Sequence, residues 1–425
     1  MSVDGVAPVI GETGIEAGAT SPLRERSEPR TLEVESLSLG TLLGRERLRF
    51  WLAFSFILWP LGPVAIPIYV LVNRVRVHRA RRGRPAPLGR LFVLWILHPF
   101  YLISTAWKRR NYGLLLSVAL LLPMYMATLW GLYVLVWGDW ENVTFMHVLL
   151  QSPLEHPPMG TDGQGRAIWI QVAAGARHSY VTSLLAVLVA LGLGLAGGRA
   201  TNAPRLEGPV MLGVQLLETI PLLFILMVVF ALFSDWSAGI SSLGMKGLLR
   251  VSVLAVALGV GFAPAMVRLI RDKIRTFKSE EFVSATKAHG IAQGDILWRH
   301  IIWKNAATDL IILAAQIWGF AMLMEVSLSY VFSIGAPKLG GEPYASWAWL
   351  LLTPESKNAL IGNVPRVFDH WWLWFFPAFF ISSAIMGFGL LGDGLKKWHR
   401  RREQSNVEET PSRFEETLGA HFAAP

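Results

Sequence analysis

Two acidic side chains interrupt apolar runs that are otherwise long enough to cross a membrane. Glu218 lies within the run 210–233, and Glu325 lies within the run 306–331. A carboxylate is costly in lipid, so such a residue usually faces water, a ligand or a charged partner. Two interpretations stay open from the sequence. Either carboxylate serves a function inside the membrane, or it is a structural group near a span end or paired with a neighbouring subunit.

No constellation of catalytic side chains accompanies these carboxylates. The sequence lacks the phosphate-binding pattern Gly-x-x-x-x-Gly-Lys-Ser/Thr and the zinc-binding pattern His-Glu-x-x-His, and its 10 histidines have no metal-ligand spacing. The absence of cysteine excludes disulfides, thiol catalysis and thiolate metal sites. We therefore expect no catalytic residue, no metal and no cofactor bound by this chain.

The composition is typical of a membrane protein. Of the 425 residues, 53% are hydrophobic and 16% are charged, and the mean hydropathy is +0.43, whereas soluble domains are about a quarter charged. The net charge of +9 arises from basic residues that cluster beside the apolar runs, as in loops that stay in the cytoplasm. This placement favours membrane orientation over nucleic-acid binding as the reason for the charge.

Six apolar segments have the length of a helical span, and none shows the alternation of a membrane barrel strand. Helices are therefore the expected spanning elements, and the predicted fold class is an all-α polytopic membrane protein. Basic residues lie at each predicted cytoplasmic turn. The six predicted spans are 112–137, 177–198, 210–233, 248–270, 306–331 and 371–391.

The chain before the first span is predicted to be an N-terminal extension. Residues 1–43 are typical of a disordered cytoplasmic tail, and residues 44–111 contain two apolar stretches, 50–72 and 91–106, joined by a basic loop. Because basic residues flank each stretch on both sides, the positive-inside rule favours re-entrant or interfacial segments over two ordinary spans with the basic loop outside. Residues 399–425 are predicted to be a second disordered cytoplasmic tail, which places both termini in the cytoplasm.

A polar loop, 279–305, lies between two apolar spans, and its many basic residues place it in the cytoplasm. The helix of the preceding span is expected to continue to residue 288, and Gly290 is expected to end it. A second short helix, 294–303, would carry Asp295 in its first turn, where an acidic side chain suits the helix dipole. This exposed segment either docks a cytoplasmic partner or lies as an amphipathic turn on the lipid surface.

This loop resembles the coupling motif of ABC transporter permeases that work with a binding protein. The motif consists of a Glu-Ala-Ala triplet, three residues, a glycine, nine residues and Ile-x-Leu-Pro. Here the triplet is Ser-Ala-Thr at 284–286, the glycine is Gly290, and the last four positions are 300–303. Serine replaces the glutamate, threonine the second alanine and Trp303 the proline. The flanking segments 281–283 and 299–301 resemble the peptide-transporter branch.

Three further stretches resemble the same branch. The glycine-rich stretch 160–166 is similar to the branch's Gly-Thr-Asp-x-x-Gly-Arg-Asp, with Ala167 where the aspartate is usual, and Gly-Ala-Arg at 175–177 follows at the family's spacing. Near the end of the chain, Gly-Asp-Gly-Leu at 392–395 resembles its Gly-Asp-x-Leu. Four motifs in order, with spans between them, identify residues 112–397 as similar to the C-type permease of dipeptide, oligopeptide or nickel importers.

The resemblance implies an architecture, partners and a substrate class. It implies a six-helix permease core over 112–398, to which the N-terminal hydrophobic segments are added, and a coupling loop over 271–305. The subunit would pair with a second homologous permease and two cytoplasmic ATPase subunits that carry ATP and Mg, and would not itself be an enzyme. An extracytoplasmic solute-binding protein would deliver di- or oligopeptides at the bacterial inner membrane, and ATP-driven rigid-body movement of the loops would open the path alternately to each side.

Single residues suggest further roles by their type and position, and the resemblance assigns the coupling surface. Asp162 and Arg166 would fix the outer loop, receive the binding protein or bind substrate, and Glu218 and Glu325 would line the translocation path. The basic run 73–90 is expected to bind anionic lipid. The ATPase-coupling surface would comprise Glu281, Phe282, Ser284, Ala285, Thr286, Gly290, Asp295, Arg299 and His300.

Two other classes of function stay open at this point. A polytopic membrane enzyme would need polar catalytic groups clustered at one membrane face, whereas the clustered groups here are mostly arginine and lysine. An autonomous channel or secondary carrier would be favoured by inverted repeats, and the sequence has no clear internal repeat. Stimulation of a co-purified ATPase would separate the transporter subunit from both alternatives.

Overall fold

The described residues of this computed structural model are almost entirely helical, with one isolated bridge between Thr161 and Ala167. The all-α fold class is therefore confirmed for this part of the chain. The tail 1–43 and residues 279–301 of the coupling loop lie outside it. The structure describes residues 56–63, 65–67, 88–108, 110–137, 148–237, 243–278, 302, 306–331, 346–352 and 369–422.

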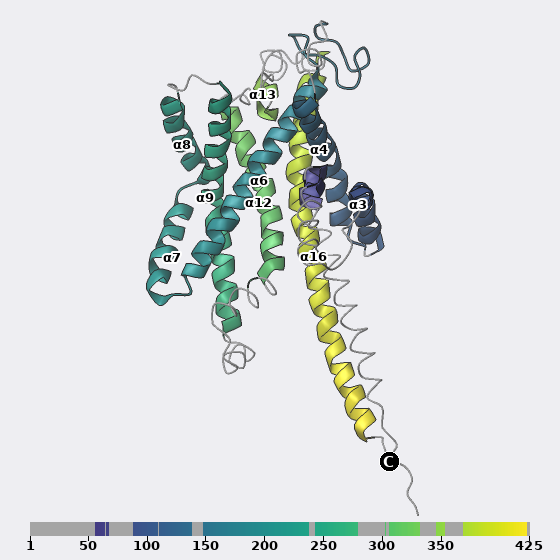
Figure 1. Cartoon of the computed structure of the whole chain (residues 1–425), viewed down its shortest axis with the longest axis vertical. Coiled ribbons are helices and arrows are strands. Elements are labelled where there is room, and N and C mark those ends of the chain that lie inside the picture. The colour runs from purple at the N-terminus through teal and green to yellow at the C-terminus, as the bar shows by residue number, and fades with distance from the viewer. Residues whose placement is uncertain are drawn as a thin grey trace, which may run out of the picture. The chain divides into compact units, whose positions relative to one another are not determined.

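Five described helices are long and apolar enough to cross a membrane, and a bent helix pair makes a sixth crossing if it counts as one span. These helices confirm a polytopic membrane protein (Figure 1). The five are α4 (Tyr112–Trp137), α6 (Ile168–Ala200), α9 (Leu243–Lys278), α12 (Ala307–Val331) and α16 (Trp372–Phe422).

The predicted span 210–233 is not one straight helix. It is divided between α7 (Pro204–Thr219) and α8 (Leu222–Ser237), whose axes meet at 88°, and both helices lie beside α9 (Figure 1). Pro221 explains the break, because proline has no backbone N–H for the helix ladder and disfavours the helical conformation of the preceding residue. Ile220 is accordingly extended, with φ −93° and ψ 127°.

Three helices extend beyond their predicted spans. α6 begins at Ile168 instead of residue 177, and α9 continues to Lys278, as expected of a helix that runs on into the coupling loop. α16 continues to Phe422, where the sequence predicted a disordered tail from residue 399. This tail is rich in glutamate and arginine, which are good helix formers, and it extends a helix that has already been nucleated.

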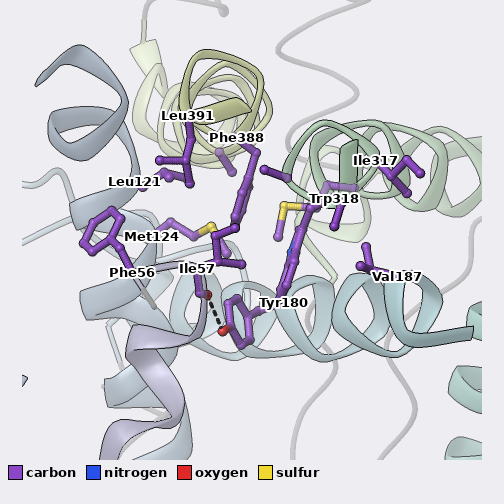
Figure 2. Packing of buried hydrophobic residues seen from close by; sticks show 14 of the residues in the cluster. Phe56, Ile57, Leu121, Met124, Tyr180, Val187, Ile317, Trp318, Phe388 and Leu391 are labelled. Atoms are coloured by element: carbon purple, nitrogen blue, oxygen red, sulfur yellow. Dashed lines mark hydrogen bonds between the residues drawn. The ribbon is translucent and has the colours of Figure 1, made fainter. Parts of the chain in front are cut away.

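Aromatic rings pack α4, α6, α12 and α16 together. Trp318 of α12 stacks on Phe388 of α16 with ring centroids 5.2 Å apart, and Tyr180 of α6 also lies 5.2 Å from Trp318 (Figure 2). Tyr125 of α4 lies 6.1 Å from Tyr180 and 6.2 Å from Phe388. Aromatic pairs of this kind contribute about 0.5–1.5 kcal/mol each beyond their burial, so these rings join the four helices.

The short 3-10 helix η1 (Phe56–Leu61) packs into this core. The hydroxyl of Tyr180 donates a 2.7 Å hydrogen bond to the carbonyl oxygen of Ile57 (Figure 2), and the ring of Phe56 lies 5.0 Å from that of Tyr125. Because Tyr125 is halfway along α4, η1 lies level with the middle of that helix. The described segment η1 of the N-terminal extension is therefore part of the packed body, while the re-entrant or interfacial course of 50–72 stays a prediction.

A second N-terminal element, α3 (Leu88–Lys108), packs on α4 and η1. Leu102 and Ala106 are buried, whereas Ile96, Phe100 and Trp107 are exposed. The exposed apolar side suits contact with lipid. Its 21 residues exceed the predicted apolar stretch 91–106, and the placement of α3 relative to the membrane stays a prediction.

Glycines let α6 approach α9 closely. A Cβ atom added at Gly194 would lie 2.3 Å from the Cβ of Met266, and one added at Gly198 would lie 2.5 Å from the Cγ2 of Ile270. Small residues allow membrane helices to pack at short distance. Gly194 and Gly198 therefore allow α6 and α9 to pack closely.

Candidate functional site

Ion pairs join the C-terminal end of α9, where the coupling loop begins, to two neighbouring helices. Glu207 of α7 accepts hydrogen bonds from Arg271 Nη2 at 2.6 Å and Nε at 3.0 Å, and it also accepts one from Arg275. Lys273 pairs with Asp309 at the start of α12. Partly exposed ion pairs are individually weak, but together these four contacts join α7, α9 and α12 at the root of the loop.

The far end of the coupling loop is held by burial. Ile302 is 3% exposed and Ala306 is fully buried, and both belong to the same apolar core as Ile270 and Ile274 of α9. The loop therefore leaves and rejoins one packed body. Its candidate docking residues lie outside the described part of the chain, so their role stays a prediction: Glu281, Phe282, Ser284, Ala285, Thr286, Gly290, Asp295, Arg299 and His300.

Glu325 is fully buried between α12 and α6. The hydroxyl of Ser179 donates a 2.8 Å hydrogen bond to its Oε2, and the hydroxyl of Ser329 donates one of 3.3 Å to its Oε1. His178 Nε2 lies 3.6 Å from Oε1. A buried carboxylate is costly unless such partners replace water. In this structure Glu325 ties α12 to α6, and a place on the translocation path stays a prediction.

Glu218 has a different environment. Its side chain is 36% exposed and pairs with Arg268 of α9, whose side chain is 46% exposed. The charged partner that the sequence allowed for in a neighbouring subunit is therefore present within the chain itself. Because the pair is not buried, both charges remain accessible to a third group, and a role on the path stays a prediction.

Asp162 and Arg166 both form hydrogen bonds within the loop 148–167 that precedes α6. The Asp162 carboxylate accepts hydrogen bonds from the backbone N–H groups of Gln164 at 2.9 Å and Arg166 at 2.8 Å, from Arg166 Nε at 2.8 Å and from Gln171 Nε2 at 3.1 Å. Gly165, with φ 73°, provides the left-handed turn that glycine adopts most readily. The two predicted residues thus hold the shape of this loop.

Sequence reasoning singled out Glu325 but missed its partners His178 and Ser179. Both are polar residues in an apolar span, and this polarity is the signal by which they could have been found. Ser179 lies 146 positions from Glu325 in the sequence, so their contact depends on how α6 packs on α12. Among the described residues, no group of three or more His, Asp or Glu side chains is placed to hold a metal ion.

A comparison with protein families identifies the kind of protein to which these helices belong. The family described as "Binding-protein-dependent transport system inner membrane component" matches residues 167–405, more than half of the chain. The chain belongs to this family. It is an ABC transporter permease subunit, a transport component rather than an enzyme, so the resemblance seen in the sequence is confirmed and neither alternative class is favoured.

Similar proteins support the same assignment. The dipeptide transport system permease protein DppC of Alkalihalophilus pseudofirmus is 29% identical over 58% of this chain and 72% of its own length. A candidate peptide transport system permease protein of Brucella suis is 27% identical over 60% of this chain and 77% of its own length. A candidate peptide permease protein of Brucella abortus is 26% identical over 69% of this permease and 87% of its own length.

Proposed function

We propose that this permease imports di- or oligopeptides across the bacterial inner membrane, with its N- and C-termini in the cytoplasm. The observation that carries the proposal is that relatives aligned over 72% to 87% of their own length are named as peptide or dipeptide permeases. In the proposed assembly the chain forms the path with a second homologous permease. An extracytoplasmic binding protein delivers the peptide, and two cytoplasmic ATPase subunits bind and hydrolyse ATP with Mg.

The ATPase subunits act on this permease through the coupling loop. One ATPase grips the part of the loop around Gly290, and its movement displaces the end of α9. The pairs of Glu207 with Arg271 and of Lys273 with Asp309 pass that displacement to α7 and α12. The cytoplasmic ends of three helices then move as one rigid body, which is the type of movement that opens a path alternately to each side.

The outer loop 148–167 contributes the opposite face of the permease. Asp162 and Arg166 use their hydrogen-bonding groups inside this loop, which supports a role in shaping a surface for the binding protein more than direct capture of substrate. Leu154 at its tip is 94% exposed and suits contact with a partner protein.

Uptake of a labelled dipeptide tests the proposal. Cells that lack this permease are compared with cells that carry it, and each is challenged with an excess of unlabelled tripeptide or of a free amino acid. We expect only the cells that carry the permease to take up the labelled dipeptide. We expect the unlabelled tripeptide to reduce this uptake and the free amino acid to leave it unchanged. Equal uptake by both strains, or competition by the free amino acid alone, would contradict peptide import.

A further inference from the structure

The break between α7 and α8 interrupts the helical hydrogen-bond ladder inside the predicted span 210–233. The last four carbonyl groups of a helix have no partner within it, and Pro221 supplies no N–H group in return. Within a membrane such backbone is tolerated where protein buries it or where it lines a water-filled cavity. Here Thr219 and Pro221 are exposed and Ile220 is 52% exposed, so the described residues of this chain do not bury the break.

Exposed polar side chains lie next to this break, on the last turns of α7. Gln215, Glu218 and Thr219 have the spacing of one helix face, all three are exposed, and Arg268 of α9 pairs with Glu218. Polar residues in spanning segments face the interior of a bundle or water, because lipid cannot solvate them. Both the backbone and the side chains of this region therefore indicate a wet surface.

We propose that Gln215, Glu218 and Thr219 of α7, together with Arg268 of α9, line the aqueous passage for substrate. In this passage Glu218 binds the ammonium end of a short peptide, and Arg268 binds its carboxylate end. The substrate is a zwitterion, so it replaces one internal ion pair by two intermolecular ones without changing the net charge of the site. The inference rests on the proposed import of peptides, and it assigns the substrate contacts that the proposed function leaves open.

The exposure of the Glu218–Arg268 pair suits it to this exchange. The two side chains are 36% and 46% exposed, and ion pairs of that exposure add little to stability, so a substrate can separate them at low cost. Glu325 makes an instructive contrast, since it is fully buried and already accepts hydrogen bonds from Ser179 and Ser329. Of these two intramembrane carboxylates, Glu218 is the accessible one.

The absence of cysteine from the chain allows a direct test of the aqueous surface. Single cysteines replace Gln215 and Thr219 in the full transporter in native membranes, and a charged, membrane-impermeant thiol reagent is applied from each side. Leu188→Cys, at an exposed apolar position of α6, is the matched control. We expect both α7 cysteines to be labelled and Leu188→Cys to stay unlabelled. Failure to label either α7 position from either side would overturn the proposal.

A second measurement tests the contact with substrate itself. The rate of dipeptide uptake is measured with the binding protein saturated, for the wild type, Glu218→Gln and Glu218→Asp. Loss of one charged hydrogen bond predicts an uptake rate about tenfold lower for Glu218→Gln, and the retained charge of Glu218→Asp should preserve most of the rate. An unchanged rate for Glu218→Gln, or an equal loss for both variants, would overturn the assignment of Glu218.

The two experiments separate this inference from the proposed function. If the wild-type transporter takes up no dipeptide, peptide import is wrong, and the substrate contacts of Glu218 and Arg268 are wrong with it. If the wild type imports dipeptide while the α7 cysteines stay unlabelled, import stands and only the aqueous surface of α7 is contradicted.

Discussion

Trp95 of α3 donates a 2.7 Å hydrogen bond from its indole N–H to the carbonyl oxygen of Trp59, and Trp59 of η1 returns one of 2.8 Å to the carbonyl oxygen of Trp95. The two rings are stacked with their centroids 5.0 Å apart. The two donors are therefore satisfied reciprocally, and the pair fixes α3 against η1. This contact makes the N-terminal extension a structural part of the permease.

Replacing Trp95 by phenylalanine should destabilise the protein. The change removes one donor and leaves the Trp59 carbonyl without it, at a cost of about 1 kcal/mol. Thermal unfolding in detergent measures the effect, and Trp107→Phe, at a position 70% exposed on the same helix, is the control. Equal melting temperatures for Trp95→Phe and Trp107→Phe would contradict the reciprocal contact.

Alanine at Gly194 should separate α6 from α9. The new Cβ would lie 2.3 Å from the Cβ of Met266, and overpacking of this kind costs about 1–3 kcal/mol. Gly192→Ala on the same helix is the matched control, because nothing lies within 4 Å of the added carbon there. We expect a lower melting temperature for Gly194→Ala alone, and the idea fails if Gly192→Ala is destabilised as strongly.

Glu325→Leu should be more harmful than Glu325→Gln. Glutamine keeps an oxygen that can accept from Ser179, whereas leucine leaves the hydroxyl buried without that acceptor. Hydrogen bonds between membrane helices are worth about 0.6 kcal/mol on average and up to about 1.7 kcal/mol. The melting temperatures of both variants measure the difference. Equal melting temperatures of the two variants would show that these hydrogen bonds do not contribute to the stability of the protein.

Reversing the Lys273–Asp309 pair tests transmission from the coupling loop. Lys273→Asp places two acidic groups together, and adding Asp309→Lys restores an opposite-charge pair between α9 and α12. We expect the single variant to hydrolyse ATP with reduced peptide uptake per ATP, and the double variant to recover part of that ratio. If the double variant is no better than the single one, the pair does not transmit the movement.

The fold was largely predictable because long apolar runs flanked by basic residues report membrane helices directly. α4 coincides with its predicted span, and α12 begins one residue after the predicted start. Packing of the N-terminal extension could not be predicted, since the bond from Tyr180 to the Ile57 carbonyl joins residues 123 positions apart. The 88° angle between α7 and α8 could not be predicted either, because it depends on how each of these helices packs on α9.

The candidate site, like the fold, was predictable from the sequence in part. The sequence pointed to three carboxylates because their surroundings are unusual: Glu218 and Glu325 lie in apolar runs, and Asp162 lies in a glycine-rich loop. Their partners Arg268, Ser179 and Gln171 come from elsewhere in the fold or the next element. Local sequence patterns therefore located the polar groups, and tertiary packing decided which of them are exposed and which are satisfied internally.

Co-purification from native membranes tests the central claim most directly. The wild-type permease is compared with Gly290→Pro, which distorts the turn of the coupling loop, and with Gly294→Pro, where proline should be tolerated as the first residue of the second short helix. The account predicts that the wild type and Gly294→Pro bring down ATPase subunits whose ATP hydrolysis responds to peptide and binding protein, and that Gly290→Pro loses this response. Recovery of the wild-type chain without any ATPase under gentle detergent would contradict the account.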